Sequence, residues 1–240
     1  MSNYPYASMR DRYDLSAYFV VGPQDTKGRP VAGVVDEALK GGATFIQLRA
    51  KPGDAADITA AARQIAQVIA DNGKSESVPF VIDDRVDVAW QCRYLGIKVD
   101  GVHIGQTDMQ PQAARALLGD DAIIGLSAEL VAQVRAANDL PEGCIDYLGA
   151  GPLHATITKP DAAVVEADGT RHTLDEAQIN ALCAASAYPI VVGGGVHADD
   201  VPMLARTKAA GWFVVSAIAG APDPLAATRE LVEAWKENRA

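Results

Sequence analysis

The sequence predicts a single closed (β/α)₈ TIM barrel. Short β-rich apolar runs recur along the chain, and each is followed by a longer segment with helical spacing, an alternation typical of βα units around a parallel sheet. A chain of 240 residues is close to the ~250 residues of one such barrel, which accommodates the units more economically than an open doubly wound sheet. Hydrophobic residues make up 49% of the chain, enough to fill a substantial core. We expect an N-terminal tail over residues 1–16 and one barrel domain over residues 17–240.

The expected strands are short runs of mainly apolar residues. In chain order we place them at Ala17–Val21, Thr44–Leu48, Pro79–Ile82, Gly101–His103, Ala122–Gly125, Tyr147–Gly149, Pro189–Val192 and Trp212–Val215. After each strand, apolar residues recur with helical spacing, so we place helices at Val31–Lys40, Asp54–Ala70, Val86–Leu95, Pro111–Leu118, Leu130–Asn138, Thr173–Ala185, Asp199–Arg206 and Asp223–Lys236. The one long polar connection runs from Gly151 to His172, and in a barrel this loop lies on the catalytic face.

Charge and cysteine content restrict the class of partner. The chain has 21 Lys and Arg against 31 Asp and Glu, and its net charge of −10 opposes binding to nucleic acid or anionic membrane. The cysteines, Cys92, Cys144 and Cys183, form neither a CxxC pair nor an even-numbered disulfide framework, which fits a reducing cytosol. Because the N-terminus has no apolar segment of signal-peptide length, we expect a soluble, cytoplasmic protein. The sequence does not fix the oligomeric state, and a homodimer is compatible with it.

The end of the second expected strand carries two cations. It reads Gln47-Leu48-Arg49-Ala50-Lys51, so both cations stand where the chain leaves the barrel. In a barrel the C-terminal ends of all strands converge on one mouth, where such cations can bind an anionic ligand. The alternative is a solvated loop whose long side chains extend into water.

Aspartates follow the next two strands. Asp83 and Asp84 come directly after the third strand, and Asp108 follows the fourth. Since adjacent strands lie ~4.8 Å apart, Asp84 and Asp108 can reach one cation, and two carboxylates with substrate phosphate oxygens and water are the usual ligands of Mg²⁺. Alternatively, Asp83 or Asp84 caps the helix that begins near Val86. His103 is a candidate contact for a pyrophosphate or an ordinary hydrogen-bonded histidine.

Polar loops also follow the fifth and sixth strands. The hydroxyl of Ser127 can bind a phosphate or cap the next helix. The loop after the sixth strand contains Thr156-Ile157-Thr158-Lys159, with two hydroxyls and one cation, although a coincidental polar loop would look the same. The glycines that precede this loop do not extend into a GxGxxG pattern, so we reject a dinucleotide-binding fingerprint.

Glycines and a serine follow the last two strands. Gly193-Gly194-Gly195 and Val215-Ser216-Ala217 stand where barrels commonly bind phosphate through backbone N–H groups, although plain tight turns are the alternative. Glycines allow a phosphate to approach the backbone closely. Together with Arg49, Lys51, Lys159 and the two expected metal ligands, this cradle implies two anionic substrates. The reaction class that it indicates is displacement of pyrophosphate by a second, monophosphorylated substrate.

In this order along the chain, the motifs resemble those of the thiamin-phosphate synthase family. The likeness runs from about Tyr18 to Ile218 and rests on an ordered set of motifs: Gln47 to Lys51, Asp84-Arg85, Gly101 to Asp108, Gly125-Leu126-Ser127, Gly151-Pro152, Thr156 to Pro160, and Val214 to Ile218. The resemblance implies a Mg²⁺-dependent barrel enzyme that joins hydroxymethylpyrimidine pyrophosphate to thiazole phosphate, with thiamin monophosphate and pyrophosphate as products.

The resemblance also implies a role for each site residue. The pyrimidine pyrophosphate is expected to contact Gln47, Leu48, Arg49, Ala50, Lys51, Ser127 and Lys159, with Mg²⁺ on Asp84 and Asp108. The thiazole phosphate is expected to contact Thr156, Thr158, Gly194 or Gly195, Val215 and Ser216. Asp83, His103 and Ile157 complete the expected substrate-binding set. The expected catalytic residues are Arg49, Lys51, Ser127 and Lys159, whose three cations would stabilise charge on the departing pyrophosphate.

The sequence departs from the family pattern at a few positions. Asp83 stands where the family usually has Asn, so an ionised Asp83 cannot donate an amide hydrogen bond to the substrate. Ile157 replaces a customary Pro, His154 replaces an apolar residue, and Ala128-Glu129 replaces a Thr-His pair. These changes can alter loop stiffness without removing a charge that the chemistry needs.

Three other functions are possible on such a barrel. A thiazole tautomerase of the same superfamily binds only the thiazole phosphate and does not need Asp84, Asp108 and Lys159 together. A sugar-phosphate epimerase needs a general acid and base deep in the barrel, and we find no such pair in the sequence. A non-catalytic module that binds thiamin phosphate would use the same contacts as the enzyme, so only turnover separates the two.

Overall fold

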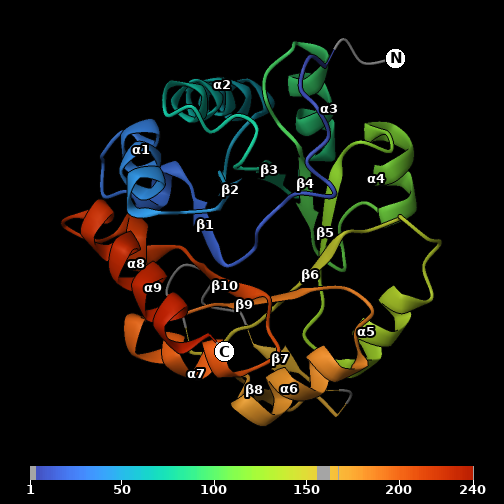
Figure 1. Ribbon diagram of the computed structural model, residues 1–240. Coiled ribbons are helices and arrows are strands. Elements are labelled where there is room, and N and C mark those ends of the chain that lie inside the picture. Colours follow the sequence, from blue (N-terminus) through green and yellow to red (C-terminus); the bar gives the residue numbers. More distant parts are fainter. Residues whose placement is uncertain (1–3, 156–162, 167, 240) are drawn as a thin grey trace.

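The centre of the computed structural model, which describes residues 4–155, 163–166 and 168–239, is a closed barrel of parallel strands. The strands follow the order β1-β2-β3-β4-β5-β6-β9-β10, and β10 pairs with β1 to close the ring. Helices surround the ring on its outside, as Figure 1 shows in a view along the barrel. The predicted TIM barrel is confirmed.

Each barrel strand overlaps the run expected from the sequence. The observed bounds are β1 (Ala17–Val21), β2 (Phe45–Leu48), β3 (Phe80–Asp83), β4 (Gly101–Ile104), β5 (Ile123–Ser127), β6 (Tyr147–Ala150), β9 (Ile190–Gly193) and β10 (Gly211–Val214). Two of the predicted site residues therefore belong to the strands themselves. Asp83 is the last residue of β3 and Ser127 the last of β5, so the barrel fixes the backbone of both.

The barrel helices also lie where helical spacing predicts them. Their bounds are α1 (Val31–Gly41), α2 (Ala55–Asp71), α3 (Val86–Tyr94), α4 (Pro111–Leu118), α5 (Val131–Asn138), α6 (Glu176–Ala185), α7 (Val201–Arg206) and α9 (Pro224–Asn238). The side chains of Asp54, Asp175 and Asp223 accept a backbone N–H at the start of α2, α6 and α9, which explains why these helices begin there. Within the described ranges, no helix has the length and apolar character needed to cross a membrane.

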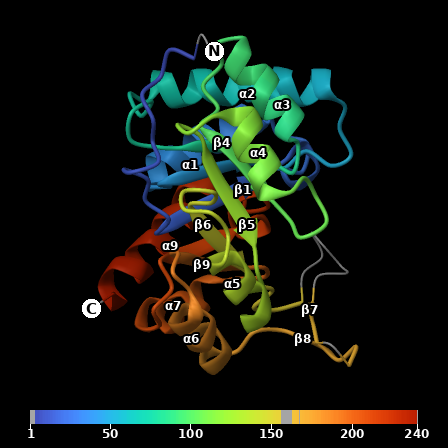
Figure 2. The same cartoon turned by 90° about the vertical axis from the view of Figure 1, so that its right-hand side faces the viewer.

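The structure adds short elements that the sequence analysis did not predict. A two-stranded antiparallel ribbon, β7 (Val164–Val165) and β8 (Arg171–His172), lies in the connection between β6 and α6. Figure 2 shows this ribbon at the edge of the molecule. A short helix, α8 (Ser216–Ala219), follows β10 directly, and 3₁₀ turns occur at Pro23–Asp25 and Ala198–Asp200.

Two layers of apolar side chains form the core, because strand residues alternate between the two faces of the barrel wall. One layer fills the space between strands and helices and includes Phe19, Ile46 and Leu48. The other fills the inside of the barrel and includes Tyr18, Phe45 and Tyr147 with smaller aliphatic residues. The inward-facing positions of β2 are therefore Phe45 and Gln47, whereas Leu48 faces the helices.

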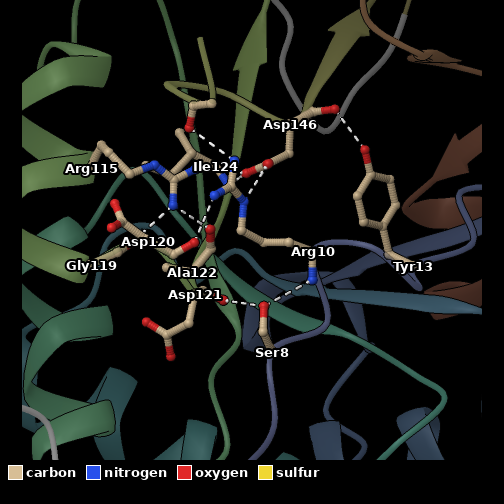
Figure 3. A network of polar contacts seen from close by, with 11 residues as sticks. Ser8, Arg10, Tyr13, Arg115, Gly119, Asp120, Asp121, Ala122, Ile124 and Asp146 are labelled. Atoms are coloured by element: carbon tan, nitrogen blue, oxygen red, sulfur yellow. Dashed lines mark hydrogen bonds and ion pairs between the residues drawn. The ribbon is translucent and has the colours of Figure 1, made fainter. Parts of the chain in front are cut away.

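The segment before β1 packs across the N-terminal end of the barrel. Met9 and Leu15 are only 1% and 3% exposed and belong to the inner layer. Figure 3 shows Arg10 and Arg115 converging on Asp146, with Nε of Arg10 at 2.7 Å from Oδ1 and Nη2 of Arg115 at 2.9 Å from Oδ2. These contacts close the end of the barrel away from the strand C-termini, so the polar ends of the strands are left as the accessible mouth.

Candidate active site

A cavity of about 160 Å³ opens inside the barrel at the C-terminal ends of the strands. Its lining draws on every strand of the ring, which is the convergence expected for a barrel mouth. The predicted site residues that line it are Gln47, Arg49, Asp83, His103, Ser127, Gly194, Gly195, Val215 and Ser216.

Asp83 lies at the centre of a charged cluster on one side of this cavity. Gln47 donates from Nε2 to Oδ1 of Asp83 at 2.6 Å. The other carboxylate oxygen lies 3.3 Å from Nζ of Lys51 and 3.6 Å from Nε of Arg49. Burial raises the pKa of Asp83, and the charges of Lys51 and Arg49 oppose that shift. The carboxylate thus fixes the positions of Arg49 and Gln47 where they face the cavity.

Asp84 and Asp108 lie beside this cluster with their carboxylates next to each other. Burial raises the pKa of Asp108, and the adjacent carboxylate of Asp84 raises it further. The N–H of Gly105 donates to Oδ2 of Asp108 at 2.9 Å, while Nζ of Lys51 contacts Oδ2 of Asp84. Asp84 has a φ of 57°, a left-handed conformation that Asp and Asn adopt more readily than other non-glycine residues.

Helix capping does not account for these aspartates. The N-cap residue of α3 is Arg85, and no side chain caps the helix, so the alternative role of Asp83 or Asp84 as a cap is wrong. Two adjacent, mutually repelling carboxylates are instead a donor set suited to a hard divalent cation. The described part of the chain contains no group of three or more His, Cys, Asp or Glu side chains placed to bind a metal.

A glycine turn follows β9, which lies opposite β3 in the ring. Gly194 and Gly195 have φ values of 82° and 76°, which favour glycine. The N–H of His154 donates to the carbonyl of Gly194 at 2.9 Å, so the loop after β6 holds the turn in place. A Cβ added to Gly195 would lie 2.9 Å from that of His154. The groups that this turn can offer to a ligand are its backbone N–H groups, and Ser216 at the start of α8 lines the same cavity.

His103 and Ser127 meet on the remaining side of the cavity. Nε2 of His103 lies 3.1 Å from Oγ of Ser127, and Nδ1 lies 3.0 Å from the hydroxyl of Tyr147. Ser127 does not cap the following helix, because Leu130 is the N-cap residue of α5. His103 is therefore both a hydrogen-bonded histidine and a cavity residue, so the two alternatives considered for it are compatible.

Other predicted site residues lie away from the cavity lining. The side chain of Leu48 is fully buried on the outer face of β2, and Ala50 packs against the same layer. Lys51 is 47% exposed and does not line the cavity, but its Nζ contacts the carboxylates of Asp83 and Asp84. The predicted loop residues Thr156, Ile157, Thr158 and Lys159 lie outside the residues that the structure describes.

Several cavity residues were not among the predicted site residues. Tyr18 and Phe213 line the cavity from β1 and β10, and Glu129 lines it from the loop after β5. The aromatic side chains look like ordinary core residues in the sequence, because each stands in an apolar strand. Glu129 could have been identified from the sequence, because it replaces a histidine that is usual in the family that the motifs resemble.

Sequence comparison identifies the family. A family profile described as "Thiamine monophosphate synthase" matches residues 17–218. The chain belongs to the thiamine monophosphate synthase family. The match extends from the first residue of β1 into α8, so it contains all strands of the barrel.

Individual relatives of the thiamine monophosphate synthase family agree with this assignment. The chain is 37% identical over 231 residues to the thiamine-phosphate synthase of Corynebacterium efficiens, covering 96% of this chain and 100% of that protein. It is 39% identical over 234 residues to the thiamine-phosphate synthase of Geobacillus kaustophilus, covering 96% of each. Among solved structures, thiamine phosphate pyrophosphorylase from Pyrococcus furiosus superposes with a TM-score of 0.76 at 28% identity, covering 97% of this chain and 100% of that one. The predicted family and enzyme class, a transferase, are confirmed.

Proposed function

We propose that this chain joins hydroxymethylpyrimidine pyrophosphate to thiazole phosphate and releases pyrophosphate, forming thiamin monophosphate. The observation that carries the proposal is that one cavity has a cation on one side and a glycine turn on the other, each of a kind that suits an anionic group. Arg49 lies on the side of β2 and β3, and the glycine turn after β9 lies on the opposite side of the ring. Membership of the thiamine monophosphate synthase family supports the same reaction.

The pyrimidine pyrophosphate would bind on the side of Arg49. The carboxylate of Asp83 holds Arg49 and Lys51 close to each other, so their charges need little reorganisation when a pyrophosphate forms. Lys159, outside the described residues, is proposed to add a third cation. As the bond between the exocyclic methylene carbon and the pyrophosphate oxygen breaks, its electron pair leaves with the oxygen. These cations would then stabilise the departing charge.

Asp84 and Asp108 are the residues that would hold Mg²⁺, with oxygens of the pyrophosphate and water as further ligands. Their fit to a divalent cation rests on two carboxylates that lie next to each other: burial raises the pKa of Asp108, and the neighbouring Asp84 adds to that shift. The ion would supply Lewis-acid neutralisation of the leaving pyrophosphate. The backbone N–H of Gly105 orients Asp108 for this role.

The thiazole phosphate would bind at the glycine turn and Ser216. Backbone N–H groups bind phosphate well when no side chain blocks the approach, as at Gly194 and Gly195. The proposed contacts of Thr156 and Thr158 fall outside the described residues. Held by its phosphate, the thiazole nitrogen would attack the methylene cation, which the electron-rich aminopyrimidine ring stabilises. In this scheme the protein holds the two substrates in position, and no side chain acts as a nucleophile.

Exchange of Arg49, on the side of the cavity proposed to bind pyrophosphate, tests the proposed synthesis of thiamin monophosphate. Purified protein with both substrates and Mg²⁺ should form thiamin monophosphate, detected by chromatography. Arg49→Met should abolish most of the turnover and raise the KM for the pyrimidine pyrophosphate, whereas Arg229→Met, on the exposed face of α9, should behave as the unchanged chain. Absence of thiamin monophosphate together with isomerisation of thiazole phosphate would favour a tautomerase. Binding of thiamin phosphate without any turnover would favour the non-catalytic module.

We further propose that the protein acts in the cytoplasm on these two small molecules, with no nucleic-acid or membrane partner. The net charge of −10 supports the absence of a nucleic-acid partner. A homodimer is the proposed assembly, and sedimentation velocity of the purified chain tests it: a monomer at all concentrations would contradict it.

A further inference from the structure

A continuous chain of hydrogen bonds crosses the inside of the barrel from β3 to β5, and both of its end residues line the cavity. The donor–acceptor distances are 2.6 Å for Asp83–Gln47, 2.7 Å for Gln47–Tyr18, 2.7 Å for Tyr18–Tyr147, 3.0 Å for Tyr147–His103 and 3.1 Å for His103–Ser127. Hydroxyl and imidazole groups can donate or accept, so a chain of this kind can run in two directions. The charge at its first residue decides which one occurs.

Asp83 allows only one orientation of Gln47. With Lys51 and Arg49 beside its second oxygen, Asp83 is a carboxylate, and a carboxylate only accepts hydrogen bonds. The Gln47 amide must therefore turn its NH₂ group to Asp83 and its carbonyl oxygen to the hydroxyl of Tyr18. Tyr18 must in turn donate to that carbonyl.

The remaining directions follow from counting hydrogens. Burial raises the pKa of Tyr18 and of Tyr147 well above the usual value, so each phenol keeps its single hydrogen. The hydrogen of Tyr18 is used on Gln47, so Tyr147 donates to Tyr18, and Nδ1 of His103 must donate to Tyr147. A neutral imidazole carries one hydrogen, which leaves Nε2 to accept from the hydroxyl of Ser127.

We propose that Asp83 is a positioning residue that sets the direction of this chain, holds His103 as its Nδ1–H tautomer and makes Ser127 a hydrogen-bond acceptor toward the ligand. An asparagine at position 83, the residue that the family pattern leads us to expect, would act in the opposite sense. Its oxygen would turn to Lys51 and Arg49, its NH₂ group would turn to Gln47, and every bond of the chain would reverse. Nε2 of the histidine would then carry the hydrogen.

Close packing keeps the rings in place in either direction. A Cβ at Gly125 would overlap both the ring of Tyr147 and the imidazole of His103, and one at Gly149 would lie 2.9 Å from Cε1 of His103. These two glycines create the space that the rings fill. The positions of the hydrogens can therefore change while the heavy atoms stay where they are.

The choice of tautomer has a consequence for recognition. With its own hydrogen given to His103, Ser127 presents oxygen lone pairs to the cavity, which suit an N–H donor on the ligand. Only the identity of that donor rests on the proposed function, under which it is the exocyclic amine of the aminopyrimidine. The direction of the chain itself does not depend on which reaction the protein catalyses.

Nitrogen NMR reads the tautomer directly in the ligand-free protein. Two-bond ¹H–¹⁵N correlation spectra of histidine-labelled protein, recorded where imidazoles are neutral, distinguish Nδ1–H from Nε2–H, and His103→Asn identifies the signals by their loss. We expect the Nδ1–H tautomer of His103 in the unsubstituted protein and the Nε2–H tautomer in the Asp83→Asn variant. Asp84→Asn, a neighbour outside the hydrogen-bond chain, should keep Nδ1–H. Nε2–H in the unchanged protein, or an Asp83→Asn spectrum that still reports Nδ1–H, would overturn the proposal.

Two further measurements keep the test decisive. If Asp83→Asn does not fold, Tyr18→Phe serves instead, because it interrupts the hydrogen-bond chain in its middle. Both tautomers of His103 should then appear. A single unchanged Nδ1–H signal would overturn the role of the hydrogen-bond chain. In steady-state kinetics, Asp83→Asn should raise the KM for the pyrimidine pyrophosphate severalfold and leave that for thiazole phosphate unchanged. An equal change in both would contradict the role of Ser127. If the proposed function is wrong, the protein shows no turnover but the NMR spectra still report the tautomer. A wrong function and a wrong tautomer assignment therefore give different results.

Discussion

Asp84→Asn and Asp108→Asn should each weaken the response of turnover to Mg²⁺ while keeping the fold. Asparagine matches aspartate in size and adopts the left-handed backbone of Asp84 equally well, so the exchange removes the charge alone. At position 108 the amide oxygen can still accept the N–H of Gly105. Asp83→Asn is the matched comparison, because it removes a neighbouring charge that is not a proposed ligand.

The expected size follows from the contacts of each carboxylate. Loss of a charged hydrogen-bonding or ligating group costs about 1.5–3 kcal/mol, which corresponds to roughly ten- to hundredfold weaker Mg²⁺ binding. The oxygens of Asp83 are already engaged by Gln47, Lys51 and Arg49. Its exchange should therefore weaken Mg²⁺ binding less than the exchange of either proposed ligand, by under about fivefold.

Titration of Mg²⁺ against pyrophosphate release measures this effect as the half-saturating concentration, which is independent of any change in the maximal rate. Thermal denaturation of the three variants serves as the control for folding. A loss of metal dependence in Asp83→Asn alone would contradict this assignment and would mean that Asp83 is the ligand.

Exchanges at other positions test the remaining residue roles. Lys159→Ala should lower kcat more than it raises the KM for pyrimidine pyrophosphate, because its charge is proposed to act as the leaving group separates; near-normal kcat would exclude that role. Gly195→Val should raise the KM for thiazole phosphate with little change for the pyrimidine, and also lower the melting temperature, since φ is 76° and the new Cβ meets His154; equal rises in both KM values would contradict this division of the mouth. Asp146→Ala should lower the free energy of unfolding in urea by about 1.5–3 kcal/mol, because two partly buried arginines lose the carboxylate that they share; a loss below about 1 kcal/mol would contradict that role. Burial raises the pKa of Cys92 to about 11, so this thiol stays protonated below that pH and should resist alkylation at pH 8 until the protein unfolds; rapid labelling of the folded chain would show that the helix layer opens.

The barrel was predictable because its signals are local. Each strand is a short apolar run and each helix has its own periodicity, so the sequence alone predicts both the number of units and their order. The ends were less predictable. Asp83 belongs to β3 because it pairs with His103 on β4, a long-range contact that outweighs its polar side chain. The helix that begins at Ser216 is too short to show a period, so its residues look like the end of a strand.

The cavity was predictable in part for a similar reason. Charged residues at strand ends, such as Arg49, are conspicuous, and barrel geometry brings them together. Tyr18 and Tyr147 give no such signal, because their hydroxyl groups meet only when β1 and β6 face each other across the closed barrel. Successive side chains of a strand point to opposite faces, so an inward-facing Gln47 places the side chain of Leu48 toward the helices. This position of Leu48 could therefore have been predicted from the sequence.

Release of pyrophosphate reports the proposed reaction itself. Its rate should be measured with both substrates and Mg²⁺ present, and again with the pyrimidine pyrophosphate, the thiazole phosphate or Mg²⁺ left out in turn. We expect release only in the complete mixture, with one thiamin monophosphate formed for each pyrophosphate. Pyrophosphate release at an undiminished rate without thiazole phosphate, or consumption of thiazole phosphate without pyrophosphate release, would contradict it.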